Sequence, residues 1–500
     1  MASRVLRSST ALTGRTGLST TSPLFSQRIA RPVAGYLKAM SAPRRGMLAT
    51  TISSFHSTAQ RLNAPVPESA SLMKTPPKVT DESITIGGQT YAADAFTNVT
   101  PTILEKTTRQ LHLLPTHPIA IIKDRISSSF PGFKHYDQFS PVVTTKQNFD
   151  DLCFADDHPG RSVTDTYYVN NKIMLRTHTS AHQSQTLAEA DRLLITADVY
   201  RRDEIDASHY PVFHQMEGAE LFDVNTVVQD VRKILETSGS KMSSTGAATA
   251  ATGAVAAATT SGNAIHTTDT TVISAENPKQ DCHSEEVMLA TADHLKHSLN
   301  QMIRNLFSDE KELQVRWIDA YFPFTSPSWE MEIFYQGEWL EVLGCGVIRQ
   351  DILNNAGKSD KVGWAFGLGL ERLAMVLFGI PDIRLFWSTD ARFLKQFQPG
   401  QIQKFKSFSK YPPCIKDISF WTVPGFHENN FCEIVRDVAG DIVEDVRLID
   451  EFTHPKTKKR SVCYRINYRS MDRNVTNAEI NEIQERLRAT VVDKLKVELR

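Results

Sequence analysis

Two adjacent pairs of long strand candidates occupy the middle of this 500-residue sequence. The first pair covers residues 193–200 and 211–223, with a polar loop between the two strands. The second pair covers 314–324 and 329–347 and turns back near Gln336. Both pairs are rich in β-branched and aromatic residues. Long hairpins that follow one another indicate an antiparallel sheet, so the sequence predicts an α+β fold in which helices flank such a sheet.

The flanking helices are predicted from the spacing of apolar residues. Leu295, Leu299 and Ile303 recur at the period of one helix face within 285–307. A second helix is predicted at 369–379. Five hundred residues exceed what a single core organises, so two or three domains are expected.

Residues from about 408 onward follow a different order of elements. The predicted elements are strand 415–423, helix 430–438, strands 446–452 and 461–468, and a final helix. Thr476 begins that helix, and Glu479 three residues later completes a predicted capping box. This βαββα order predicts a small ferredoxin-like domain.

Residues 1–62 are predicted to be a mitochondrial transit peptide. The first 67 residues hold nine Lys and Arg and no Asp or Glu. An Arg-rich, Ser-rich and acid-free segment is typical of organellar targeting, and a disordered tail or nonspecific basic arm is the alternative. The six cysteines are scattered without a Cys-x-x-Cys pair, which favours free thiols in a reducing compartment. Both observations fit the mitochondrial matrix.

Composition also divides the remainder of the chain. A Pro-, Ser- and Thr-rich stretch makes 63–89 a predicted linker, before a large domain at 90–406 and a C-terminal domain at 407–500. A run of Ala, Thr, Ser and Gly at about 238–272 has little apolar bulk. Such a run predicts a disordered surface insertion, with an Ala-rich helix as the alternative.

Charge and hydropathy limit the possible partners. After residue 67, 47 Lys and Arg face 57 Asp and Glu, so a polyanion must be met by a local basic patch. The apolar stretch at 373–380 is far shorter than the ~18–20 residues of a membrane-spanning helix, and no membrane insertion is expected.

The loop of the first hairpin carries the densest polar chemistry. Arg-Arg-Asp at 201–203 ends one strand, and Phe-His-Gln-Met-Glu at 213–217 begins the next. An arginine can bind a phosphate in two-pronged fashion, an aromatic ring can stack on a base, and a carboxylate–amide pair can hold an ammonium group. A solvated hairpin tip is the alternative.

A glycine-rich strand end at 363–369 leads into the helix that contains Arg372. Glycines there allow a nucleotide to approach the backbone closely. Arg372 replaces the third glycine of a dinucleotide fingerprint, and the phosphate-binding Gly-x4-Gly-Lys pattern is missing from the sequence. Any ATP site is therefore of another kind.

His178 and His182 lie four residues apart in the stretch 176–183. Zinc ligation would require a glutamate after the first histidine and a third, distant ligand, so hydrogen bonding to a substrate or a structural role is favoured. Phe322 and Phe324, near Trp329, are either core residues or an aromatic wall for a flat apolar substrate.

Three stretches resemble the motifs of class II aminoacyl-tRNA synthetases: Ser140-Pro-Val-Val-Thr-Thr, Tyr200-Arg-Arg-Asp with Phe213-His-Gln-Met-Glu-Gly, and Gly367-Leu-Gly-Leu-Glu-Arg372. Three more narrow the resemblance to single-chain, mitochondrial phenylalanine–tRNA ligases: Thr177-His-Thr-Ser, Tyr321-Phe-Pro-Phe-Thr and Glu341-Val-Leu-Gly-Cys-Gly. The resemblance covers about 100–500 apart from the insertion. It implies a class II antiparallel sheet, a ferredoxin-fold anticodon-binding domain and a monomer.

The resemblance implies a role for each matching residue. Arg201 and Arg372 would be catalytic through the phosphates of ATP. The implied ATP-binding residues are Arg201, Asp203, Ser208, His209, Tyr210, Phe213, Glu341, Phe366 and Arg372, with Glu341 also holding Mg²⁺. The implied phenylalanine-binding residues are His178, Ser180, Ala181, His182, Gln183, Gln215, Glu217, Phe322, Phe324 and Ala365.

A basic cluster in the C-terminal domain is the expected contact for mitochondrial phenylalanine tRNA. It consists of Lys456, Lys458, Lys459, Arg460, Arg465, Arg469 and Arg473. Tyr464 and Tyr468 are expected to be available for stacking on bases. A merely solvated basic loop is the alternative.

Two other functions compete with this interpretation. A synthetase for another amino acid is disfavoured by Phe322 and Phe324. A catalytically dead paralogue that only binds RNA would have lost the ATP-binding arginines and the ammonium-binding pair. Arg201, Arg372, Gln215 and Glu217 are all present, which favours the enzyme.

Overall fold

The computed structural model describes residues 77–80, 82–240, 242, 264–309, 312–335, 337–407 and 411–500. They all belong to one compact unit, Pro65–Arg500. The predicted transit peptide lies outside the described residues.

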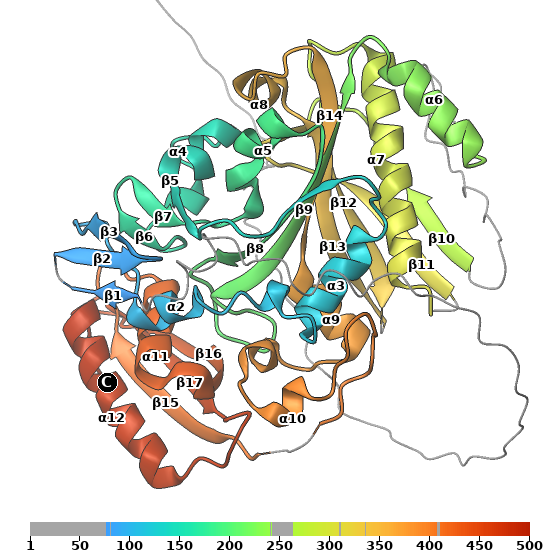
Figure 1. Ribbon diagram of the computed structural model, residues 1–500. Coiled ribbons are helices and arrows are strands. Elements are labelled where there is room, and N and C mark those ends of the chain that lie inside the picture. The colour runs from blue at the N-terminus through green and yellow to red at the C-terminus, as the bar shows by residue number, and fades with distance from the viewer. Residues whose placement is uncertain are drawn as a thin grey trace, which may run out of the picture. The chain divides into compact units, whose positions relative to one another are not determined.

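An eight-stranded sheet organises the larger part of the described chain (Figure 1). Its order is β10-β11-β12-β13-β14-β9-β8-β4. The bounds are β4 Lys134–Tyr136, β8 Arg192–Tyr200, β9 Val212–Asp223, β10 Ala264–Asp269, β11 Glu312–Ala320, β12 Thr325–Tyr335, β13 Glu338–Ile348 and β14 Lys361–Gly369. Only β10 and β4, at the two edges, pair in parallel; the six strands between them are antiparallel. The predicted antiparallel sheet is confirmed.

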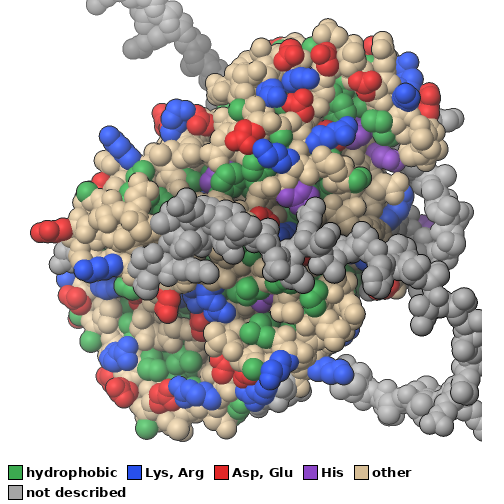
Figure 2. All heavy atoms as spheres, in the orientation of Figure 1, with side chains coloured by type: hydrophobic (Ala, Val, Ile, Leu, Met, Phe, Trp, Pro, Cys, Tyr) green, Lys and Arg blue, Asp and Glu red, His purple; other side chains and the backbone are tan. Residues whose placement is uncertain are grey.

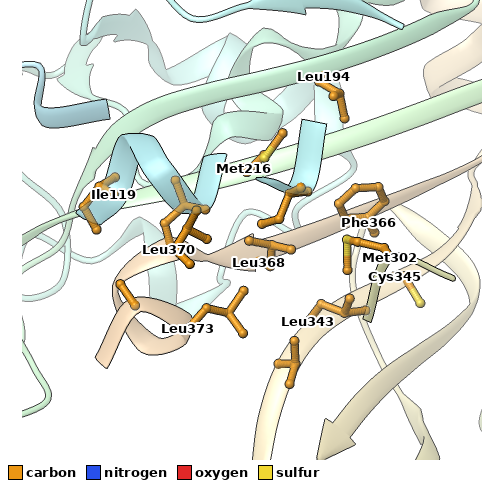
Figure 3. Packing of buried hydrophobic residues seen from close by; sticks show 14 of the residues in the cluster. Ile119, Leu194, Met216, Met302, Leu343, Cys345, Phe366, Leu368, Leu370 and Leu373 are labelled. Atoms are coloured by element: carbon orange, nitrogen blue, oxygen red, sulfur yellow. The ribbon is translucent and has the colours of Figure 1, made fainter. Parts of the chain in front are cut away.

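Long helices cover one face of this sheet and short ones the other. The first group is α3 Pro118–Ser127, α7 Glu285–Leu306 and α9 Leu370–Phe378, with α6 Val227–Thr237 packed on α7. The second is η4 Thr179–His182, α5 Gln183–Glu189 and α8 Gln350–Asn355. Figure 3 shows the core between the sheet and the first group, where Met216, Leu343, Phe366 and Leu368 meet Ile119, Met302, Leu370 and Leu373.

Short elements complete this part of the chain. Two three-stranded sheets contain β1 Lys78–Val79, β2 Ser83–Ile86 and β3 Gln89–Ala92, and β5 Val142–Thr144, β7 Ile173–Leu175 and β6 Tyr168–Asn170. The short helices are α2 Pro101–Lys106, η1 Leu111–Leu113, α4 Thr145–Asn148, η2 Asp150–Leu152, η3 Pro159–Arg161, η5 Ile383–Trp387 and α10 Ala391–Leu394.

Three expectations about local structure are corrected. Strand β2 lies inside the predicted linker and buries Ile84 and Ile86. Strand β10 lies inside the predicted disordered insertion and pairs with β11, because 264–269 contains β-branched residues; residues 243–263 are outside the described chain. The expected strand 314–324 ends at Ala320, before Pro323, which has no N–H to donate to a ladder.

The C-terminal part is the predicted ferredoxin-like domain. Its elements are β15 Cys414–Trp421, α11 Glu428–Ala439, η6 Gly440–Ile442, β16 Val443–Thr453, β17 Arg460–Tyr468, α12 Asn477–Leu495 and β18 Glu498–Leu499. The sheet order is β16-β17-β15-β18. Thr476 caps α12 through the N–H of Glu479 at 3.2 Å, but the Glu479 side chain bonds Arg473, so only half of the expected capping box forms.

Tyr464 and Tyr468 are buried between this sheet and its helices. Tyr464 packs on Phe431 with ring centroids 4.6 Å apart, and Tyr468 donates its hydroxyl to Gln484. The expectation that they are available for stacking on bases is wrong, because their strand positions face the helices. Within the described chain, no helix combines the length and apolarity needed to span a bilayer.

Candidate active site

Phe213, Gln215 and Glu217 point to the same face of β9 because successive strand side chains alternate. Their neighbours on β14 are glycines, with Gly369 opposite Gln215 and Gly367 opposite Glu217. A Cβ atom added at either glycine would meet no atom within 4 Å. The sheet face lined by short helices therefore has open space directly above these polar side chains.

Glu217 is buried and is held by three donors from the segment beside it. The hydroxyl groups of Ser180 and Thr179 lie 2.5 and 3.1 Å from Oε2, and the Gln183 amide lies 2.9 Å from Oε1. Gln215 accepts the backbone N–H of Thr179 at 3.3 Å. Burial raises the pKa of Glu217 to about 7 even though the three hydrogen bonds lower it. A cationic ligand would compensate the burial of this carboxylate.

His178 is half-buried nearby, and its two ring nitrogens are shielded from solvent without a hydrogen-bond partner among the described residues. Its ring stacks on Phe154, with centroids 5.6 Å apart. Burial, followed by the charge of Arg201, lowers the pKa of His178 to about 3. The imidazole is therefore neutral, and its unpaired polar atoms are suited to a ligand.

Two aromatic rings adjoin this polar cluster. Phe322 and Phe324 stack with centroids 5.9 Å apart. Phe322 lies against the backbone of Gly344, where an added Cβ would be 2.5 Å from the ring. Ala365 projects on the same face as Gly367, two residues away, and Phe324 packs against its cluster. The predicted phenylalanine-binding residues on β9, β14 and η4 thus converge with the aromatic pair.

Arg201 and Phe213 adjoin one another at the end of the first hairpin. The guanidinium carbon of Arg201 lies 5.2 Å from the Phe213 ring centroid, and its Nε donates to the Thr177 carbonyl at 2.8 Å. Arg372, at the start of α9, donates to a Glu341 carboxylate oxygen at 3.2 Å. Both arginines are predicted site residues, and both approach the open sheet face.

Glu330 adjoins Glu341, and no sequence motif pointed to it. Burial, then the charges of Glu341 and Glu332, raise the pKa of Glu330 to about 7. Glu332 and Glu341 are opposite one another across β12 and β13. Glu332 pairs with Arg316 and Glu341 pairs with Arg372, so Glu330 is the carboxylate whose charge a bound cation would compensate.

The hairpin loop is organised around Asp206. Its carboxylate accepts the backbone N–H groups of Ser208 and His209 and lies 2.8 Å from Nδ1 of His209. This hydrogen bond to Asp206 raises the pKa of His209 above its usual 6.5. The protonated form of His209, which this hydrogen bond favours, suits an anionic ligand.

The base of the same loop is held by the C-terminal domain. Arg436 of α11 donates to the carbonyl groups of Asp203 and Glu204. Ile205 packs into the hydrophobic core of that domain, and its carbonyl accepts the N–H of Val446 at 3.0 Å. The position of Asp203 therefore depends on the C-terminal domain as well as on the hairpin.

Three predicted site residues point away from the open face. Phe366 alternates with Ala365 and lies in the core (Figure 3), where it stacks on Phe130 with ring centroids 5.3 Å apart. Tyr210 is buried and donates its hydroxyl to Asp441 at 2.6 Å. His182 uses both ring nitrogens within the protein, toward Arg176 and Gln185. Ala181 is buried in a separate hydrophobic cluster with Val143, Phe149 and Met174.

The predicted tRNA-contacting residues are largely paired with carboxylates. Their ion pairs are Lys459–Glu498, Arg460–Glu451, Arg465–Asp417, Arg469–Glu444 and Arg473–Glu479. Lys456 and Lys458 are exposed in the turn between β16 and β17. Figure 2 likewise shows basic and acidic side chains intermixed on the face in view. Several of these pairs are solvent-exposed and are easily exchanged for phosphate.

Comparison with known proteins follows the two parts of the fold. Residues 103–249 and 285–397 match the model of the tRNA synthetases class II core domain (F), and 409–500 match the ferredoxin-fold anticodon binding domain. The chain is 45% identical over 454 residues to the mitochondrial phenylalanine–tRNA ligase of Saccharomyces cerevisiae, covering 83% of this chain and 95% of that protein. It is 46% identical to the mitochondrial protein of Mus musculus, covering 82% and 87%. It is 44% identical to the chloroplastic/mitochondrial protein of Arabidopsis thaliana, covering 86% and 92%.

Proposed function

This chain belongs to the phenylalanine–tRNA ligases of class II, and from that membership we propose how its residues bring about the reaction. The enzyme joins phenylalanine and ATP to give phenylalanyl-adenylate and pyrophosphate. The acyl group then passes to the terminal adenosine of the tRNA. Because the carboxylate nucleophile is already charged, the protein needs chiefly to position the substrates and offset phosphate charge.

Phenylalanine binds over β9 with its ammonium group at Glu217 and Gln215. The burial of the Glu217 carboxylate, which three neutral donors hold toward the open sheet face, is the single observation that carries this assignment. Ser180 and Gln183 keep the carboxylate oriented, and His178 offers unpaired ring nitrogens. Phe322 and Phe324 supply the aromatic wall for the benzyl ring, and Ala365 limits the depth of the pocket.

ATP binds at the other end of the same sheet face. The adenine stacks on Phe213, and Arg201 contacts the α-phosphate where negative charge develops. Arg372 holds the distal phosphates. Ser208 and His209, in its protonated form, lie on the loop above them. The proximity of Arg201 to Phe213 and the raised pKa of His209 support this division of roles.

Mg²⁺ fits the carboxylates beside the ATP position. Oxygen ligands suit this ion, and Glu341 and Glu330 would hold it. The ion would in turn offset the repulsion between the two carboxylates, which contributes to the raised pKa of Glu330. No group of three ligating side chains surrounds one point among the described residues, so ATP phosphates and water would complete the shell. The bound ion would supply further compensation of phosphate charge.

We further propose a monomer that acts in the mitochondrial matrix on mitochondrial phenylalanine tRNA. Relatives named mitochondrial and the acid-free leader support the compartment. The C-terminal domain would contact the tRNA through its basic cluster.

Amino-acid-dependent ATP–pyrophosphate exchange tests the function directly. The protein lacking residues 1–62 would be assayed with each of the twenty amino acids, without tRNA. We expect exchange with phenylalanine far above all others. Exchange with none of them, from a folded sample, would favour a dead paralogue that only binds RNA.

A further inference from the structure

A buried carboxylate, Glu371, joins strand β9 to helix α9 on the core side of the sheet. One oxygen accepts the backbone N–H of His214 at 2.7 Å, and the other lies 2.6 Å from Nδ1 of the same residue. The side chains are 3% and 0% exposed. Two bonds to one residue fix both its backbone and its ring.

The change from strand to helix explains why a side chain is needed there. Strand β14 pairs with β9 as far as Gly369, opposite Gln215, and then turns into α9 at Leu370. No strand therefore continues the ladder on that side of His214. A buried backbone N–H without a partner is costly, and the Glu371 carboxylate takes the place of the missing strand carbonyl.

The His214 ring is further confined by aromatic neighbours. It stacks on Trp387, with centroids 5.8 Å apart, and lies 5.3 Å from the ring of His112. Its Nε2 has no hydrogen-bond partner among the described residues. Among the described residues, Glu371 is therefore the hydrogen-bond partner that holds this ring.

We propose that Glu371 is a positioning residue that sets the distance between the two substrates through His214. His214 stands between Phe213 and Gln215, which serve ATP and phenylalanine respectively, and Glu371 immediately precedes Arg372. One carboxylate thus ties the strand that carries both pockets to the helix that carries the phosphate-binding arginine. The proposal rests on the proposed function. Small errors in the alignment of two reactants cost large factors in rate.

The test compares Glu371→Gln with Glu220→Gln. Glu220 is buried on the same strand and pairs with Arg192 at 2.7 Å, away from the substrates. We expect Glu371→Gln to lower kcat for pyrophosphate exchange about 10- to 100-fold, with the Kd values for phenylalanine and ATP within about threefold of wild type. Glu220→Gln should lose similar thermal stability and keep its kcat.

The outcomes distinguish failure of the proposed function from failure of the positioning role of Glu371. If the wild type catalyses no exchange, the proposed function fails. If the wild type is active and both variants lose kcat equally, or Glu371→Gln keeps its kcat, the positioning role fails. His214→Ala and the double variant His214→Ala/Glu371→Gln add an independent check. If His214 and Glu371 act as a unit, kcat should fall no further in the double variant than in the more impaired of the two single variants.

Discussion

At the scale of single residues, the proposed role of Glu217 predicts that its protonation controls phenylalanine binding. Because the pKa of Glu217 is about 7, the carboxylate must lose its proton before it can pair with an ammonium group. We therefore expect affinity to rise with pH and to level off above about 7, changing up to tenfold per unit below that value. Calorimetric titration of phenylalanine between pH 5.5 and 8.5 measures this, with Glu217→Gln as a weak, pH-independent control. A flat profile for the wild type would contradict the assignment.

Gly367 gives a second prediction at this scale. The methyl group of Gly367→Ala would meet no protein atom within 4 Å and would occupy ligand space instead. We expect kcat/KM for pyrophosphate exchange to fall about 10- to 100-fold while the melting temperature stays near that of wild type. Gly363→Ala, on the same strand, is the matched control. Its added Cβ would lie 2.4 Å from the Glu220 carbonyl oxygen, so this variant should have a lower melting temperature. Full activity of Gly367→Ala would mean that substrates bind elsewhere.

At the scale of elements, helix α11 holds the hairpin loop that bears His209. Arg436→Met would leave the carbonyl groups of Asp203 and Glu204 without this donor and the buried Glu433 without its nearer ion-pair partner, at a cost of about 3–5 kcal/mol in the free energy of unfolding. We expect the KM for ATP to rise more than the KM for phenylalanine, because the released loop is the one that bears His209. Denaturant unfolding and pyrophosphate exchange measure the two effects, with the exposed Arg488→Met on α12 as control. Equal changes in both KM values would argue against loop positioning.

At the scale of the whole molecule, the proposed function predicts that tRNA binding and amino-acid activation depend on different domains. Charge reversal at Lys458, Lys459 and Arg460 should weaken aminoacylation through a higher KM for tRNA, with less dependence on salt. Pyrophosphate exchange without tRNA should be unchanged. Reversal at Arg488, Lys494 and Lys496, on or directly after α12 of the same domain, changes the net charge by the same amount and is the control. Equal loss of both activities in the cluster variant would contradict the separation.

The sequence alone was sufficient where the pattern is local. The hairpins around 193–223, the βαββα order after 408 and the Thr476 cap follow from periodicity and short-range hydrogen bonding. Ordered motifs placed Arg201, Gln215, Glu217 and Arg372 in one predicted site, and the structure brings them to one sheet face. The hairpin, the order of elements and the cap depend on residues close together in the chain, whereas the four site residues were grouped by the resemblance of their motifs to a known family.

Tertiary structure decided which side of each strand is covered. Phe366 and Ala365 are adjacent in sequence, yet helices α3 and α7 bury one of them and leave the other beside the open face. Tyr464, Tyr468 and Tyr210 likewise face partners that are remote in the chain, and strand β10 forms only because β11 offers an edge. Glu371 meets His214 across 157 positions. The alternation of side chains along a strand can be predicted from the sequence, whereas long-range packing determines which face of the strand is buried in the core.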